Sequence, residues 1–174
     1  VRSTFSFGLS GDNNIRLDQA LGGGALMDVG CYGVNLARLV TGAEPTNVAA
    51  VAHYSSSGVD ESFAGVLAFP NRVVAEFDVS FAAAGGPSYE LIGTSGKLVV
   101  RQGFKINGDE EGEIQLHQAG DVSRIFTDVV DQYQLMVEDF GKTVLDGRAY
   151  PFPAPDAVAN MRVLDALQAA AQRA

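Results

Sequence analysis

The fold is organised around one stretch of sequence, which reads Gly22-Gly23-Gly24-Ala25-Leu26-Met27-Asp28-Val29-Gly30-Cys31-Tyr32-Gly33-Val34-Asn35. Apolar residues recur at helical intervals in and after it, and they predict a helix that ends at Gly42: Leu26, Val29, Val34, Ala37, Leu39 and Val40. A glycine inside a helix costs about 1 kcal/mol relative to alanine. Gly30 and Gly33 therefore predict that another segment approaches the backbone of this helix closely.

The predicted helix has a polar face, because Asp28, Tyr32 and Asn35 stand at positions i, i+4 and i+7. A phenol has a reference pKa of about 10, so Tyr32 can exchange a proton near neutral pH only if a cation or hydrogen bonds stabilise its phenolate. Asp28 could orient a substrate hydroxyl or join a proton relay, but its charge would raise the pKa of Tyr32. The spacing alone favours a plainer interpretation, in which Tyr32 caps the core with its hydroxyl in solvent.

The three glycines at 22–24 allow two interpretations. They could present backbone N–H groups to an anion at the helix N-terminus, or they could simply permit a tight turn into the helix. They do not form a dinucleotide-binding fingerprint, because Met27 stands where the third Gly or Ala belongs. Arg16 could clamp a phosphate or a sugar hydroxyl, or it could be solvated or paired with Asp18. Asn35 could bind a substrate, or it could be buried and satisfied by backbone groups.

Length and composition are those of one ordinary globular domain. The chain has 174 residues, of which 47% are hydrophobic and 19% charged. Its net charge of −9 argues against nucleic acid or an anionic membrane as a partner. Cys31 is the only cysteine, so no internal disulfide is predicted. The chain starts at Val1 without a signal-like segment and looks cut from something longer, and a cytoplasmic setting is expected.

A metal site is not predicted. His53 and His117 are single residues without a second ligand at metal-like spacing. The acidic cluster at 109–113 is punctuated by glycines but does not match a calcium loop, so it is interpreted as a solvated loop.

The remaining sequence predicts strands followed by two helices. Strands are expected at 1–8, 47–57, 61–69, 73–81, 89–92, 97–100, 104–107 and 113–117. Helices are expected at 133–144, stopped by Gly147, and at 156–171. This order predicts an α+β fold in which helices pack on one face of an open, mostly antiparallel sheet, a two-layer sandwich. The other face is expected to carry Val, Leu and Phe as a large apolar patch, which is typical of an interface.

The pattern G-G-G-A-L-x-D-x-G-x-Y, followed by an Arg and by Gly-x-x-Pro, resembles the second domain of the glucose–fructose oxidoreductase / inositol dehydrogenase family, Gfo/Idh/MocA. The resemblance extends over most of the chain, including residues 14–18, 89–96 and 160–167. Many relatives have His at the position of Tyr32. The Tyr form is similar to the branch that contains glucose–fructose oxidoreductases, xylose dehydrogenases and dihydrodiol dehydrogenases.

The resemblance implies a C-terminal, substrate-binding domain over residues 1–174 of an enzyme that uses NAD or NADP to oxidise or reduce a sugar, polyol or related diol. It implies that Tyr32 is the acid/base, with Asp28 beside it, and that Gly23 and Gly24 lie near the nicotinamide. In the family a Lys of a Glu-Lys-Pro motif, in the nucleotide-binding half, supplies the cation. This motif and the Rossmann domain are absent from the chain. The chain alone is therefore expected to be inactive.

The family also implies self-association through the open sheet face, as a homodimer or tetramer. In a second interpretation the protein has the same fold but is not catalytic. It would then be a sugar-sensing or regulatory subunit that binds a partner through the sheet. The presence of both Asp28 and Tyr32 favours the catalytic interpretation.

Overall fold

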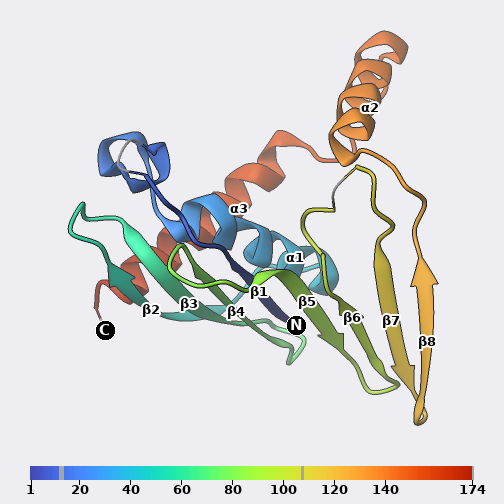
Figure 1. Ribbon diagram of the computed structural model, residues 1–174, viewed down its shortest axis with the longest axis horizontal. Coiled ribbons are helices and arrows are strands. Elements are labelled where there is room, and N and C mark those ends of the chain that lie inside the picture. The colour runs from blue at the N-terminus through green and yellow to red at the C-terminus, as the bar shows by residue number, and fades with distance from the viewer. Residues whose placement is uncertain (12–13, 107, 174) are drawn as a thin grey trace.

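The computed structural model describes residues 1–11, 14–106 and 108–173 (Figure 1). Eight strands form one sheet: β1 (Arg2–Ser6), β2 (Asn47–Tyr54), β3 (Asp60–Ala68), β4 (Val74–Ser80), β5 (Gly86–Ile92), β6 (Lys97–Val100), β7 (Glu113–Gln118) and β8 (Asp121–Phe126). They lie in the order β2-β3-β4-β1-β5-β6-β7-β8, and β1 and β4 are parallel while the other neighbours are antiparallel. The predicted open, mostly antiparallel sheet is confirmed.

The helical segments differ in how they relate to the sheet. They are the 3-10 turns at Ile15–Leu17 and Gln19–Leu21, a π-helical turn at Leu26–Gly30, α1 (Cys31–Thr41), α2 (Gln132–Asp146) and α3 (Ala154–Ala171). Helices α1 and α3 lie over one face of the sheet, as predicted, whereas α2 stands away from it (Figure 1). The apolar side chains of α2 are consequently exposed: Tyr133, Leu135, Met136, Val137, Phe140, Val144 and Leu145. None of the described helices is long and apolar enough to cross a bilayer.

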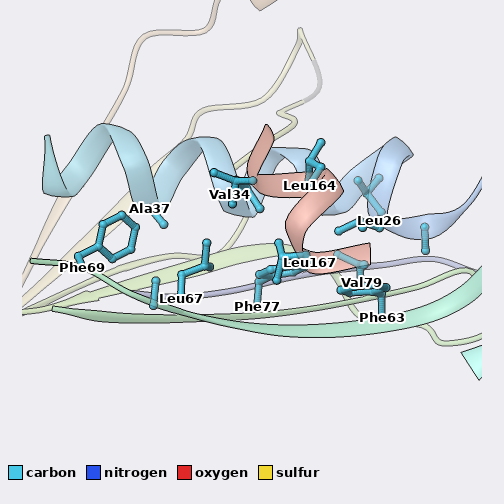
Figure 2. Close-up of a cluster of buried hydrophobic side chains, with 14 of the residues drawn as sticks. Leu26, Val34, Ala37, Phe63, Leu67, Phe69, Phe77, Val79, Leu164 and Leu167 are labelled. Carbon is cyan, nitrogen blue, oxygen red and sulfur yellow. The ribbon is translucent and has the colours of Figure 1, made fainter. Parts of the chain in front are cut away.

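The core lies between α1, α3 and the central strands. Figure 2 shows Leu164 and Leu167 of α3 and Val34 and Ala37 of α1 above the sheet. The residues that meet them from β3 and β4 include Phe63, Leu67, Phe77 and Val79, all of which are buried. This burial is what fixes the helix carrying Asp28 and Tyr32 against the sheet.

Two glycines allow α1 and the turn before it to approach the sheet closely. A Cβ atom at Gly33 would lie 2.7 Å from Ser3 Oγ and 3.1 Å from Phe77 Cβ. At Gly30 it would lie 3.1 Å from Leu26 Cδ1 of the same turn and 3.4 Å from Phe77 Cε2 of β4. The close approach predicted from the glycines is therefore confirmed, and the residues approached belong to β1 and β4.

The outer sheet face is less apolar than predicted. The large residues of β3 and β4, such as Phe63 and Phe77, point toward the helices and are buried there. The outer face has small and β-branched apolar residues on β2, β3 and β4, including Val51, Val66 and Val74. Charged residues share this face, since Glu76 lies opposite Val66 and pairs with Arg2. Further along the sheet, the ion pairs Lys97–Glu90 and Arg124–Glu113 join neighbouring strands. For β3 and β4 the prediction of exposed Leu and Phe was wrong, because the pleat directs Phe63, Leu67 and Phe77 to the helix side.

Two strand predictions near residues 100–126 need correction. Residues 104–106 form no strand, and Asn107 lies outside the described residues. In contrast, β8 was not predicted, although it pairs with β7 along its whole length. All six residues of β8 are exposed, so burial imposes no hydrophobic alternation on its sequence.

Candidate active site

The glycines before the helix make a tight turn whose N–H groups are engaged within the loop. Gly23 N–H donates to Asp18 O at 2.9 Å, and Gly24 N–H donates to Arg16 O at 2.9 Å. A side chain at Gly23 would overlap the backbone carbonyl of Arg16. The interpretation of these two N–H groups as an anion site was therefore wrong, and the tight-turn interpretation is confirmed for them.

A buried carboxylate occupies the N-terminus of the helical segment. Asp60 Oδ2 accepts a hydrogen bond from Leu26 N–H at 2.6 Å, and Asp60 is only 4% exposed. Burial raises the pKa of Asp60, and hydrogen bonds from backbone N–H groups, that of Leu26 first, oppose this rise. Sequence reasoning missed Asp60, because no local pattern links a residue at the start of β3 to a turn far earlier in the chain.

The helix begins with a π-helical turn rather than an α-helical one. Cys31 N–H donates to Leu26 O, five residues earlier. Single π-helical turns within helices are frequent at functional sites. Here the turn contains Asp28 and leads directly into α1, where Tyr32 stands in the first turn.

Arg16 and Asp28 form a close ion pair at the surface of this turn. Arg16 Nε donates to Asp28 Oδ2 at 2.6 Å, and both side chains are partly exposed. Asp18 is not the partner of Arg16, since its carboxylate accepts from Ala20 N–H at 2.8 Å. Of the two plain alternatives for Arg16, the pair with Asp18 was wrong, and the partly exposed side chain is paired with Asp28 rather than only solvated.

Tyr32 lies beside this ion pair and is 46% exposed. Its pKa is raised above the usual value, first because burial disfavours the phenolate and then because Cys31, Tyr133 and Asp28 add negative charge when ionised. Arg16 opposes the rise. The phenol of this chain is therefore protonated at neutral pH. A further cation is needed before Tyr32 can act as a base there, as the sequence predicts.

Aromatic rings surround Tyr32 on the helix side of the sheet. Phe5 of β1 and Phe104 each stack on Tyr32 with ring centroids 5.9 Å apart, and Phe5 and Phe104 stack on each other at 6.1 Å. Tyr89 of β5 meets Phe104 at 5.4 Å. Sequence reasoning assigned no such contact to Phe104, which it placed in a strand. These contacts hold the Tyr32 ring while leaving part of it exposed.

Asn35 does not join the pair of Arg16 and Asp28. It is exposed and lines a separate pocket of about 520 Å³ with Arg38, Phe152 and Asp156. The interpretation of Asn35 as a buried residue satisfied by backbone was therefore wrong.

Arg38 forms a buried link between α1 and α3 that sequence reasoning missed. It is 6% exposed, and its guanidinium donates to Glu44 Oε1 at 2.7 Å and to Asp156 Oδ1 at 2.8 Å. Asn160 of α3 adds a weaker contact to the guanidinium at 3.4 Å. A buried cation is tolerated where such partners compensate for lost hydration. This link holds α3 against the helix that carries Tyr32. In the described part of the chain, no group of three or more His, Cys, Asp or Glu residues is arranged to hold a metal ion.

The part of the chain that contains the site matches a known protein family. Residues 1–99 match the model of the GFO/IDH/MocA C-terminal domain, and this range contains Arg16, Asp28 and Tyr32. Among curated relatives, D-xylose 1-dehydrogenase (NADP(+)) 2 of Haloferax volcanii is 32% identical over 99% of this chain and 53% of its own length. Human trans-1,2-dihydrobenzene-1,2-diol dehydrogenase is 31% identical over 47% of this chain and 25% of its own length.

Solved structures share the fold at lower identity. KijD10, a 3-ketoreductase from Actinomadura kijaniata solved with NADP and TDP-benzene, superposes with a TM-score of 0.90 at 23% identity, covering 97% of this chain and 52% of its own. Aldose-aldose oxidoreductase from Caulobacter crescentus, complexed with glycerol, gives 0.88 at 24% identity, covering 99% and 52%. The chain spans about half the length of the relatives first matched, namely 53% and 48%.

Proposed function

Because the chain belongs to the GFO/IDH/MocA C-terminal domain family, we propose that it is the substrate-binding half of an NADP-dependent oxidoreductase that acts on an aldose or a related polyol or diol. A nucleotide-binding half completes this enzyme. The observation that carries the proposal is the half-exposed Tyr32 beside the ion pair of Arg16 and Asp28. The names of two xylose dehydrogenase relatives support NADP and an aldose substrate.

The residues of this chain supply positioning and proton transfer. When bound, the nicotinamide accepts or supplies the hydride. Tyr32 takes the proton of the substrate hydroxyl during oxidation and returns it during reduction. Asp28 orients that hydroxyl through a carboxylate oxygen, while Arg16 partly neutralises the carboxylate and so limits its effect on the pKa of Tyr32.

The nucleotide phosphates do not fit the turn at 22–24. The N–H groups of Gly23 and Gly24 donate to carbonyl oxygens within the loop, and the Asp60 carboxylate already accepts from Leu26 N–H. A second anion there would be repelled. We therefore assign phosphate binding to the nucleotide-binding half. Gly23 and Gly24 contribute to this site by allowing the tight turn, because a Cβ atom at either position would meet the Arg16 carbonyl or the Asp60 carboxylate.

The direct test is a spectrophotometric assay of the full-length protein with NAD or NADP and a panel of aldoses, polyols and cyclic diols. NADP-dependent oxidation of an aldose is expected. A protein that binds such a sugar but reduces neither nucleotide would instead support the sugar-sensing or regulatory alternative.

This chain alone is expected to bind neither NAD nor NADP with useful affinity, because the sequence lacks a Gly-x-Gly-x-x-Gly fingerprint between a strand and a helix. Titration calorimetry of the chain, with the full-length protein as the positive control, makes the comparison. A micromolar dissociation constant for the chain would contradict the assignment of nucleotide binding to the other half of the protein.

The chain is also expected to self-associate, as a dimer or tetramer, through the outer face of β2, β3 and β4, where Val51, Val66 and Val74 are exposed. Val66→Lys should give a monomer, because it places a charge in the middle of this face. Val158→Lys changes a similarly exposed valine of α3 and serves as the control. Light scattering at tens of micromolar, roughly the range in which a standard interface holds, reports the mass. A monomeric unmodified chain would refute this expectation.

A further inference from the structure

We propose that Asp60 is a positioning residue that fixes the turn into the helix and, through this turn, the relative placement of Arg16, Asp28 and Tyr32. This role in catalysis rests on the function proposed above. The placement itself can be measured without any activity.

The carboxylate of Asp60 contacts the turn, although Leu26 lies 34 residues earlier in the chain. Asp60 begins β3 and is almost fully buried, and its Oδ2 atom accepts from Leu26 N–H at 2.6 Å. Gly24 packs against the same carboxylate so closely that a Cβ atom would overlap Asp60 Oδ1. Gly24 also has φ +124°, a conformation that other residues rarely adopt. The start of β3 and the turn therefore pack closely against each other where Asp60 contacts Gly24 and Leu26.

The helix has no cap of its own, which explains why a distant residue is needed. Helix termini leave backbone N–H groups without partners, and a side chain at the N-cap usually satisfies one of them. Here the residue at that position, Ala25, provides no side-chain hydrogen bond. A Ser or Asn at the N-cap would avoid the cost of burying a carboxylate. An acceptor from β3 has another effect, because it ties the start of the helix to the sheet.

The turn held by Asp60 connects to both members of the ion pair. Gly24 N–H donates to Arg16 O at 2.9 Å, and Gly24 O accepts from Asp28 N–H at 3.1 Å. Leu26, which Asp60 holds, is the first residue of the π-helical turn that contains Asp28. If this turn moves, the backbones of Arg16 and Asp28 move relative to each other, and Tyr32 in the next turn moves with them.

The placement is tested by hydrogen exchange of the Leu26 amide in this chain. Asp60→Ala removes the acceptor and should speed exchange by about 10-fold or more, as expected for a buried donor that loses its partner. Asp60→Asn keeps one acceptor oxygen and should preserve most of the protection. If Asp60→Ala leaves the Leu26 amide as protected as in the unmodified chain, the proposal is overturned.

The effect on catalysis is tested in the full-length protein. Asp60→Ala should lower kcat by about 100-fold, which is the effect expected when reacting groups are slightly misplaced. Asp60→Asn should keep most of the kcat of the unmodified protein. Val163→Ala removes buried volume from α3 in the same core and serves as the stability control. It should lower the melting temperature and leave kcat within about twofold, since Val163 takes no part in the hydrogen bonds of the turn. A kcat loss that merely follows the loss of stability in both variants would overturn the positioning role.

Gly24→Ala provides a second route should Asp60→Ala not fold. It keeps Asp60 but displaces its carboxylate, so it should also unprotect Leu26 and lower kcat. Unchanged Leu26 exchange in a folded Gly24→Ala protein would contradict the proposal. An inactive unmodified protein with a protected Leu26 amide would instead count against the proposed oxidoreductase function alone.

Discussion

Tyr32→Phe in the full-length protein is expected to lower turnover by about 100- to 10,000-fold, the usual cost of losing a positioned proton carrier. Phe keeps the ring contacts with Phe5 and Phe104, both at 5.9 Å, so the core around residue 32 should remain intact. Substrate affinity should change far less, because one hydroxyl contact contributes only about 0.5–1.5 kcal/mol. Turnover, the Michaelis constant and the melting temperature measured on the same protein separate these effects.

Asp28→Asn is the informative companion of this variant. It removes a negative charge that raises the pKa of Tyr32 and releases Arg16, which lowers that pKa. The acidic limb of the pH–rate profile should therefore move to lower pH, with a milder loss of turnover. A Tyr32→Phe protein with near-normal turnover and reduced stability would remove Tyr32 from the mechanism and make it a structural cap.

Gly33→Ala is expected to destabilise the chain by about 1–3 kcal/mol, although alanine is the better helix former. The added Cβ atom would lie 2.7 Å from Ser3 Oγ, so α1 would have to move away from β1 and β4. For a chain of this size each kcal/mol corresponds to about 2–4 °C in melting temperature. Calorimetry or circular dichroism during heating measures the change.

Gly141→Ala in α2 is the matched control for this prediction. A Cβ atom there meets no described atom within 4 Å, so the substitution should stabilise its helix by about 0.5–1 kcal/mol. The two variants make the same chemical change and should shift the melting temperature in opposite directions. A Gly33→Ala protein as stable as Gly141→Ala would show that the close approach of α1 to the sheet is not a constraint on the fold.

Local patterns in the sequence were sufficient for most elements of the fold. The helical spacing of Leu26, Val29 and Val34 predicts the helix, and the two costly glycines within it predict the close approach that Ser3 and Phe77 make. The hairpin of β5 and β6 follows from its Gly-Thr-Ser-Gly turn. These features depend on neighbours in sequence, which is why they can be read from it.

Other features depend on contacts between distant segments and could not be read in this way. The partner of Leu26 N–H is Asp60, and the partners of Arg38 include Asp156, 118 residues away. The exposed strand β8 leaves no hydrophobic pattern. For α2 the apolar spacing is correctly helical, but spacing does not tell whether a helix lies on the sheet or stands away from it, as α2 does.

The measurement that tests the central claim most directly is the pKa of Tyr32, in this chain and in the full-length protein. Isotope-labelled tyrosine observed by NMR, with Tyr32→Phe to assign the signal, gives both values. In the chain alone the pKa should lie above the usual value of about 10, for the reasons of burial and charge given above. In the full-length protein, the cation of the nucleotide-binding half should lower it toward neutrality. A pKa that stays equally high in both proteins would contradict the assignment of Tyr32 as the acid/base.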